Sequence, residues 1–233
     1  MDALTNGLPA RYGDVPRARF ERAVALGLRP GLSILDVGSG RRPSLPTDRR
    51  PDGCRYVALD LDRIELERAP HGAYDELVVA DVVQRLRDLE ERFDLVAGFH
   101  VLEHVRPLVT ALENLRAYLR PGGRLVAMLS GAFAAFALAN RLLPDTIGKV
   151  VMDRLMDRDP ETVFHAYYDR CWYSALERSL RPWARVEIAA SFQGAEYFNF
   201  ALPARRAYVA YENWASRGGH LNLATHYLVE AVR

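Results

Sequence analysis

The stretch LDVGSGRRPSLP, Leu35 to Pro46, reads as the end of a buried strand followed by a glycine turn. Gly38 and Gly40 permit a tight turn and let a ligand approach the backbone, because glycine has no Cβ. A nucleotide-binding turn normally leads into a helix. Here Pro43 follows, and proline inside a helix removes a backbone donor and clashes with the preceding turn. The sequence therefore predicts an irregular loop over 41–51, with no helix longer than about two turns.

Apolar runs of strand length recur around this turn, with helical segments between them. They lie at 32–38, 55–62, 76–81, 93–101 and 123–130. Runs without polar alternation are typical of parallel strands buried on both faces, so the sequence predicts an α/β fold. Helices are expected over 16–26 and from Pro107 to a stop at Pro121-Gly122-Gly123. Two late runs, 184–191 and 224–232, are typical of an antiparallel edge pair with a helical segment between them.

Length and composition indicate one domain over residues 1–233, because 233 residues with 49% hydrophobic content supply one sizeable core. The net charge of +1 gives no reason to expect nucleic acid as a partner. Cys54 and Cys171 are too few for a disulfide framework or a zinc site. No signal peptide is apparent, and the apolar run 131–143 is shorter than the roughly 20 residues of a membrane-spanning helix. We therefore expect a cytoplasmic protein without a transmembrane segment, as a monomer or homodimer.

Acidic residues end the first three predicted strands. Asp60 lies about 20 residues after the glycine turn, the spacing at which a carboxylate accepts hydrogen bonds from ribose hydroxyls. Asp36 and Asp81 end the neighbouring strands. Three acids suit a ligand that carries amines and hydroxyls rather than phosphates. A dinucleotide needs a third glycine where Pro43 stands, so the sequence disfavours a nucleotide-dependent oxidoreductase.

Several segments together carry a family resemblance. LDVGSG, VALDLD, VVADV, FDLVAGFHVLEHV and LRPGGRLVAML stand in the order and spacing of the class I, Rossmann-like S-adenosylmethionine-dependent methyltransferases, and the chain resembles the bacterial small-molecule type over about 32–130. The resemblance implies a seven-stranded sheet of order 3-2-1-4-5-7-6, with strand 7 antiparallel and helices on both faces. It divides the chain into a cofactor-binding half (1–130), a helical insertion that caps the acceptor (131–172) and a C-terminal strand pair with its own helical insertion (173–233).

The same resemblance implies the cofactor site. It places Asp36, Gly38, Ser39 and Gly40 around the methionine moiety, Asp60 with Leu61 at the ribose, Asp81 near the adenine amine, Val82 beside the ring, and Phe99 with His100 at the methionine end. Arg41 or Arg42 is a candidate for the methionine carboxylate through charge-assisted hydrogen bonds. The alternative is that both arginines are solvated surface residues.

Methyl transfer from a sulfonium is a direct displacement that needs a base only when the acceptor is a hydroxyl. His100 and His104 are the candidate bases at the end of the fourth strand. If this stretch is helical, they share a face and with Glu103 form a candidate divalent-metal site. The alternative is that Glu103 and His104 bond to backbone at a helix start. No metal is predicted.

The segment VFHAYYDRCW, 163–172, supplies candidate acceptor residues. His165, a further catalytic candidate, Tyr168 and Arg170 would offer a titratable group, a hydroxyl and a fixed cation. The alternative is a helix start whose aromatic residues pack into the core. His71, His220 and His226 are interpreted as ordinary histidines without a role.

The sequence thus predicts an S-adenosylmethionine-dependent enzyme that methylates a hydroxyl or amine of a small molecule of glycan or natural-product type. The alternative is a catalytically silent domain that binds S-adenosylmethionine or S-adenosylhomocysteine and regulates a partner.

Overall fold

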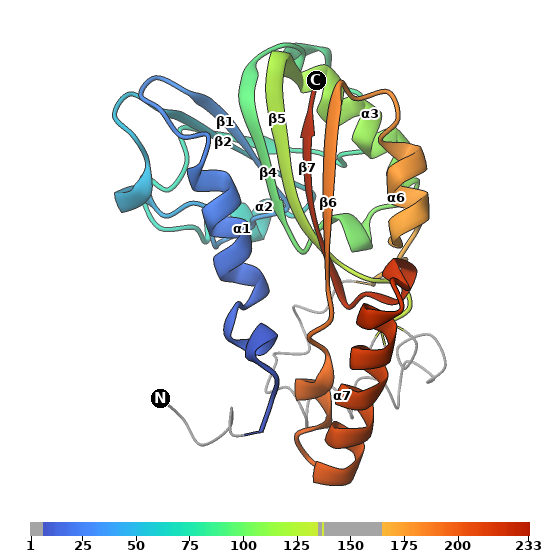
Figure 1. Ribbon diagram of the computed structural model, residues 1–233. Helices are drawn as coiled ribbons and strands as arrows, with labels where there is room; N and C mark the ends of the chain where they lie inside the picture. Colours follow the sequence, from blue (N-terminus) through green and yellow to red (C-terminus); the bar gives the residue numbers. More distant parts are fainter. Residues whose placement is uncertain (1–6, 135–136, 138–164) are drawn as a thin grey trace.

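The computed structural model describes residues 7–134, 137 and 165–233. Its centre is a seven-stranded sheet with the order β3-β2-β1-β4-β5-β7-β6 (Figure 1). The strands are β1 (Ser33–Val37), β2 (Arg55–Asp60), β3 (Glu76–Val79), β4 (Phe93–Phe99), β5 (Leu119–Ser130), β6 (Arg185–Ser191) and β7 (His226–Val232). β1 to β5 pair in parallel, and β7 is antiparallel to both β5 and β6. The predicted strand order and the antiparallel seventh strand are confirmed.

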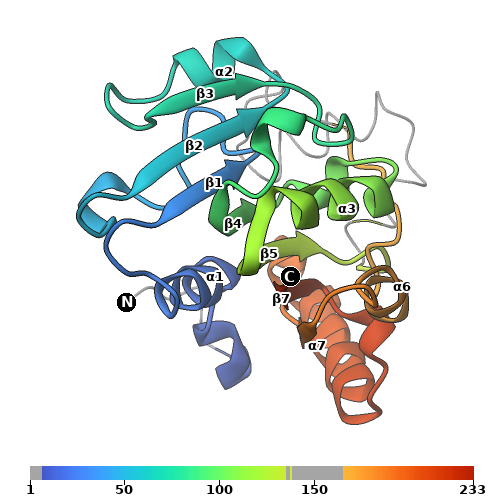
Figure 2. The same cartoon turned by 90° about the horizontal axis from the view of Figure 1, so that it is seen from above.

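Helices cover both faces of the sheet, as predicted. The α-helices are α1 (Pro16–Ala25), α2 (Arg63–Glu67), α3 (Leu108–Tyr118), α6 (Tyr173–Ser179) and α7 (Leu202–Arg217), and the 3₁₀ turns are η2 (Ala10–Gly13), η3 (Thr47–Arg49), η4 (Arg87–Leu89), η5 (Leu102–His104), η7 (Ala195–Phe198) and η8 (Leu221–Leu223). Figure 2 shows α1 on one side of the sheet and α3 with α6 on the other. Phe20 and Val24 of α1 pack into one hydrophobic core, and Leu112 of α3 and Leu176 of α6 pack into a second.

The helix before β5 ends earlier than the sequence predicts. α3 stops at Tyr118, and the chain is already extended at Leu119, ahead of the Pro121-Gly122-Gly123 segment. The reason is tertiary: Leu119 pairs with Phe93 of β4, so strand geometry begins before the residues that cannot continue a helix.

The loop after β1 confirms the prediction for 41–51. Its one helical element is η3, a single 3₁₀ turn. Buried Asp36 shapes this loop, because its Oδ2 accepts hydrogen bonds from the Ser44 N–H at 2.7 Å and from the Tyr56 hydroxyl at 2.6 Å. Side-chain hydrogen bonds thus replace the helix that the prolines prevent.

The carboxyl ends of the parallel strands meet the start of β7, since Ser130 at the end of β5 pairs with His226. α7 extends beyond this edge of the sheet, where the N-terminal segment also lies (Figure 1). Buried Glu212 joins α7 to the N-terminal turn η2, because it accepts hydrogen bonds from Arg11 and Tyr12. It also accepts a hydrogen bond from the Gly194 N–H. Most of the predicted acceptor cap, 135–136 and 138–164, lies outside the described residues.

Candidate functional site

The glycine turn after β1 lies against the end of β2. Gly38 and Gly40 both have positive φ, 67° and 49°. A Cβ on Gly38 would lie 2.2 Å from Cγ2 of Val101, so this position excludes any side chain. The Gly40 N–H donates to Oδ2 of Asp60 at 2.9 Å. The turn and the acid that the sequence separates by about 20 residues are therefore in direct contact.

Asp60 has the surroundings expected for a diol-binding acid. Its Oδ1 accepts from the Asp62 N–H at 2.9 Å, and burial raises the pKa of its carboxyl. Each carboxylate oxygen keeps a lone pair, because each accepts one of these two hydrogen bonds. Leu61 next to it is 66% exposed, which leaves an apolar surface beside the acid. These residues fit the ribose and base of a nucleoside.

Asp36 and Ser39 lie in the same turn but are engaged within the protein. Asp36 is fully buried, and burial raises the pKa of its carboxyl. Its Oδ1 has no hydrogen-bond partner among the described residues. Ser39 Oγ lies 2.5 Å from the Tyr74 hydroxyl, which also donates to the Gly40 carbonyl at 3.0 Å. Asp36 therefore shapes the turn.

Asp81 and Val82 follow β3 at the same edge. Asp81 accepts from the Val83 N–H at 3.0 Å, and Val82 is 6% exposed with its carbonyl bonded to Asn114. Their predicted adenine contacts stay predictions.

The two arginines of the opening motif differ in their surroundings, and Arg42 is exposed. Arg41 forms a two-pronged ion pair with Glu65 of α2, at 2.7 and 3.0 Å. A different arginine reaches the region: Arg17 of α1 lies 4.8 Å from the centre of the Phe99 ring and donates to the Ser44 carbonyl at 2.9 Å. Sequence reasoning missed Arg17, because nothing in the sequence around α1 indicates that it folds over the end of β4.

His100 and Glu103 form a hydrogen-bonded dyad after the end of β4. His100 Nδ1 lies 2.8 Å from Glu103 Oε1, which also accepts from the Ser130 N–H at 3.1 Å. Glu103 is 3% exposed. Burial disfavours its charge, but His100, His104 and local hydrogen bonds together outweigh burial and hold the pKa of Glu103 at about 2. An ionised carboxylate accepts hydrogen bonds only, so neutral His100 carries its proton on Nδ1 and a free lone pair on Nε2.

The interpretation that His100 and His104 share a helical face is wrong. Leu102–His104 is a 3₁₀ turn, and His100 precedes it with a φ of 56°, which a right-handed helix does not accept. His104 Nδ1 instead lies 3.1 Å from the His165 carbonyl oxygen. In the described ranges, no group of three or more His, Cys, Asp and Glu residues could hold a metal ion.

The three predicted acceptor residues differ in burial. Tyr168 is 2% exposed and packs in the larger hydrophobic core, and its N–H donates to the Glu103 carbonyl at 2.9 Å. His165 and Arg170 are exposed. The burial of Tyr168 supports the alternative of aromatic packing for this residue, and the acceptor roles of His165 and Arg170 stay predictions.

His226, to which sequence reasoning gave no role, lies against the predicted base His100. It is 7% exposed, its Nδ1 has no hydrogen-bond partner among the described residues, and its ring meets that of His100 edge to face with centroids 5.5 Å apart. Burial lowers the pKa of His226 to about 3, so the ring is neutral. One sequence signal could have indicated a site role. An antiparallel last strand begins at the edge where the parallel strands end, and His226 is the first residue of β7.

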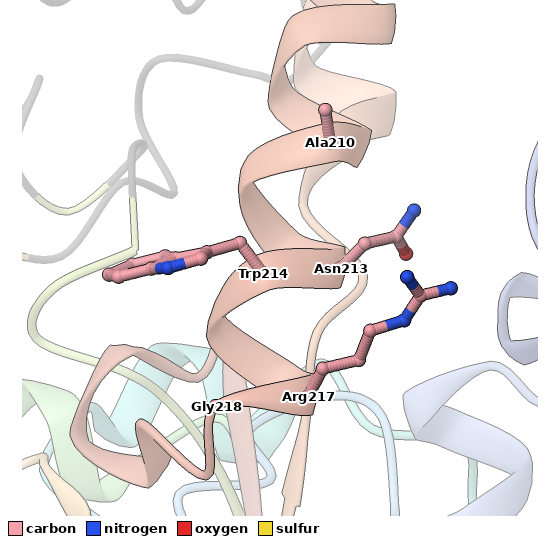
Figure 3. A pocket seen from close by; sticks show the side chains of 5 residues that line it. All are labelled: Ala210, Asn213, Trp214, Arg217 and Gly218. Carbon is pink, nitrogen blue, oxygen red and sulfur yellow. The ribbon is translucent and has the colours of Figure 1, made fainter.

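A surface hollow lies elsewhere, on α7. It is lined by Ala210, Asn213, Trp214, Arg217 and Gly218, and Figure 3 shows Trp214 extending from one side of the helix and Asn213 with Arg217 from the other. None of the predicted site residues lines it.

A mixed sheet of this order, with a glycine turn held against an acid at the end of β2, defines the class I S-adenosylmethionine-dependent methyltransferase fold. The family described as "Methyltransferase domain" matches residues 11–222. The chain belongs to this family. It is an S-adenosylmethionine-dependent methyltransferase, which confirms the enzyme class and the cofactor predicted above.

Three similar proteins show how far the likeness extends. A demethylmenaquinone methyltransferase of Beutenbergia cavernae is 28% identical over 189 residues, covering 75% of this chain and 71% of that protein. A ubiquinone biosynthesis O-methyltransferase of Rhodopseudomonas palustris is 30% identical over 132 residues, covering 54% of this chain and 51% of that protein. The chain therefore spans about half the length of this ubiquinone-pathway relative. The geranyl diphosphate C-methyltransferase of Streptomyces coelicolor superposes with a TM-score of 0.55 at 14% identity, covering 93% of this chain and 75% of that one.

The methyltransferase relatives named here act on small molecules, in agreement with a small-molecule acceptor. Within the described part of the chain, no helix has the length and apolar character needed to cross a membrane.

Proposed function

We propose that this methyltransferase transfers a methyl group to the hydroxyl of a phenol or hydroxyquinol. The observation that carries the proposal is the 2.8 Å contact between His100 Nδ1 and buried, ionised Glu103. This contact leaves Nε2 of His100 as a base beside the cofactor end of the sheet. The names of the quinone-pathway relatives supply the aromatic class of the acceptor.

The cofactor supplies an activated methyl group on a positively charged sulfur. His100 takes the hydroxyl proton on Nε2 as the oxygen forms its bond to the methyl carbon. The bond between that carbon and sulfur breaks at the same time, and its electron pair stays on the sulfur. Glu103 stabilises the imidazolium that forms, and the proton then passes to solvent. The products are the methyl ether, S-adenosylhomocysteine and one proton, so the step balances.

Asp60, Leu61 and the glycine turn hold the cofactor in this proposal. Phe99 lies at the methionine end, where its ring meets the Arg17 guanidinium. Arg17 and Arg41 are then both candidate cations for the methionine carboxylate, and each already pairs with a glutamate, Glu21 and Glu65 respectively. The division into a cofactor half (1–130), an acceptor cap (131–172) and a C-terminal part (173–233) stays part of this proposal, as do the roles of His104, His165 and Arg170.

The test uses purified protein, S-adenosylmethionine and a panel of phenols, catechols and short-chain prenylated hydroxyquinols, with mass detection of methylated product. His100→Gln should lower kcat about 100-fold, the usual contribution of a general base, while S-adenosylhomocysteine affinity stays within about threefold. His71→Gln, a change at an exposed histidine, is the matched control. Binding of S-adenosylhomocysteine without turnover on any acceptor would favour the silent regulatory domain instead.

A further inference from the structure

The second histidine of the cluster has an unusual environment. His226 is buried, and in the described part of the chain its ring makes no hydrogen bond. A buried N–H without an acceptor is the rarer and costlier arrangement. Because Nδ1 is the enclosed nitrogen, the proton of the neutral ring belongs on Nε2. His226 then presents an N–H donor.

His100 presents the complementary group. Its Nδ1 proton is held by Glu103, so its Nε2 is an acceptor. Among the described residues, no hydrogen bond satisfies this Nε2 either. An oxygen bonded to one nitrogen of each ring needs those nitrogens within about 6 Å, twice a normal hydrogen-bond distance. The ring centroids lie 5.5 Å apart, a separation at which two rings turned toward one oxygen can both bond to it.

Other groups around His226 keep it neutral. Burial and Arg19 of α1 oppose protonation of His226, as would His100 once it has taken a proton, and Glu103 favours it. Ser130, paired with His226 across the sheet, lies with its hydroxyl 3.2 Å from His100 Nδ1 and on the same strand edge. A donor and an acceptor therefore lie side by side where β4 ends and β7 begins.

We propose that His226 donates a hydrogen bond from Nε2 to the acceptor oxygen, so that the site selects a hydroxyl and rejects an amine. This inference rests on the proposed function and names what sets its acceptor class. A hydroxyl has one proton and two lone pairs. Its proton goes to His100 and one lone pair to His226, and the remaining lone pair is directed at the methyl group. A neutral amine has a single lone pair, which His226 would occupy, leaving none to attack.

The first test needs no acceptor. Nitrogen NMR of histidine side chains, in protein labelled at the ring nitrogens and saturated with S-adenosylhomocysteine, reports the tautomer of each ring. We expect His226 as the neutral Nε2–H form and His100 as the Nδ1–H form near neutral pH. A charged His226, or its Nδ1–H tautomer, would overturn the proposal.

The second test measures binding of catechol and of 1,2-diaminobenzene to the same S-adenosylhomocysteine complex. We expect catechol to bind more tightly than the diamine, and His226→Phe to weaken catechol about fivefold, as for one lost hydrogen bond, with S-adenosylhomocysteine affinity unchanged. His226→Asn keeps a donor and should retain part of the preference, and His71→Phe is the control. Equal catechol affinity in the wild type and His226→Phe, or no catechol binding at all, would refute the selection.

The two proposals fail separately. If the tautomers are as expected but no phenol is methylated, the proposed function fails while the donor role of His226 stands. If phenols are methylated in a His100-dependent reaction but His226→Phe changes neither binding nor the preference for oxygen, only this inference fails.

Discussion

At the scale of single residues, the site depends on carboxylates with different surroundings. Asp36 is enclosed and bonded to the loop, Asp60 keeps lone pairs at the end of β2, and Glu103 is paired with a histidine. Each is an acid at a strand end in the sequence. Only Asp60 combines free lone pairs with an exposed apolar neighbour, so it is the acid we assign to the cofactor ribose.

Asp60→Ala should weaken S-adenosylhomocysteine binding about tenfold or more, because a charge-assisted hydrogen bond is worth about 1.5–3 kcal/mol. Calorimetric titration measures the loss. Asp52→Ala, at an exposed acid in the preceding loop, serves as the control. An unchanged affinity in a folded Asp60→Ala protein would remove Asp60 from the cofactor site.

The buried histidine predicts acid sensitivity. In the folded protein the pKa of His226 is about 3, whereas an unfolded histidine titrates near 6.5. Between these values the unfolded chain binds a proton that the folded chain does not, so stability falls as the pH is lowered through this window. At pH 5 the loss from this residue is about 2 kcal/mol relative to pH 7.5.

Urea unfolding at both pH values checks this expectation. His226→Phe should lose about 2 kcal/mol less than the wild type on going to pH 5, since phenylalanine does not titrate. The pKa of Glu103 in the folded protein, about 2, lies below that of an unfolded glutamate. Glu103 therefore also lowers the stability in acid, but only once the pH falls to the range in which unfolded glutamates titrate. If both proteins lost the same free energy of unfolding between pH 7.5 and pH 5, the buried, neutral state of His226 would be contradicted.

At the scale of elements, Glu212 of α7 anchors three segments. It is 1% exposed, and its Oε1 accepts from the Gly194 N–H at 2.6 Å and from the Thr225 hydroxyl at 3.2 Å. Its Oε2 accepts from the Tyr12 hydroxyl and from Arg11 at 3.1 Å. α7, the N-terminal turn and the entrance to β7 are therefore held by a single carboxylate.

Glu212→Ala should destabilise the fold by about 3 kcal/mol, because it breaks a buried ion pair and leaves buried donors without an acceptor. Chemical unfolding at neutral pH measures this. Glu196→Ala, at an exposed acid of η7, should change stability by less than about 0.5 kcal/mol. Similar values for the two variants would show that Glu212 does not anchor these segments.

At the scale of the whole molecule, the proposed cofactor site lies at the ends of β1 and β2, and the His100–Glu103 dyad follows β4 beside the end of β5. A ligand bound at this edge contacts several strands, so it binds the folded protein and not the unfolded chain. It therefore stabilises the folded state by mass action. The ligand that does so also distinguishes a methyltransferase from a dinucleotide-dependent enzyme.

S-adenosylhomocysteine at about 100 times its Kd should add about 2.7 kcal/mol, which raises Tm by roughly 5–10 °C for a chain of this size. NAD at the same concentration should leave Tm unchanged, because the turn after β1 lacks the third glycine and the helix that hold a pyrophosphate. Differential scanning fluorimetry checks both. A rise with NAD and none with S-adenosylhomocysteine would reverse the cofactor assignment.

The parallel strands, the irregular loop after the glycine turn and the place of Asp60 were predictable from the sequence. Each depends on local chemistry: buried apolar runs, prolines that interrupt a helix, and a spacing set by one strand–loop–strand unit. The order of the strands in the sheet came instead from the family resemblance. The same local signals failed at the end of α3, where pairing of Leu119 with β4 decides the boundary, and at His100, where a positive φ replaces the helix considered for that segment.

The partners of the site residues were decided by tertiary structure alone. Arg41 pairs with Glu65, Arg17 reaches Phe99, and His226 meets His100 across long separations in sequence. A sequence shows which side chains are available, but their contacts and protonation depend on burial and on neighbours that only the folded sheet brings together. The type of protein and its cofactor follow from local patterns, whereas the base that we propose, its partner Glu103 and the proposed donor on His226 depend on three strand ends meeting at one edge.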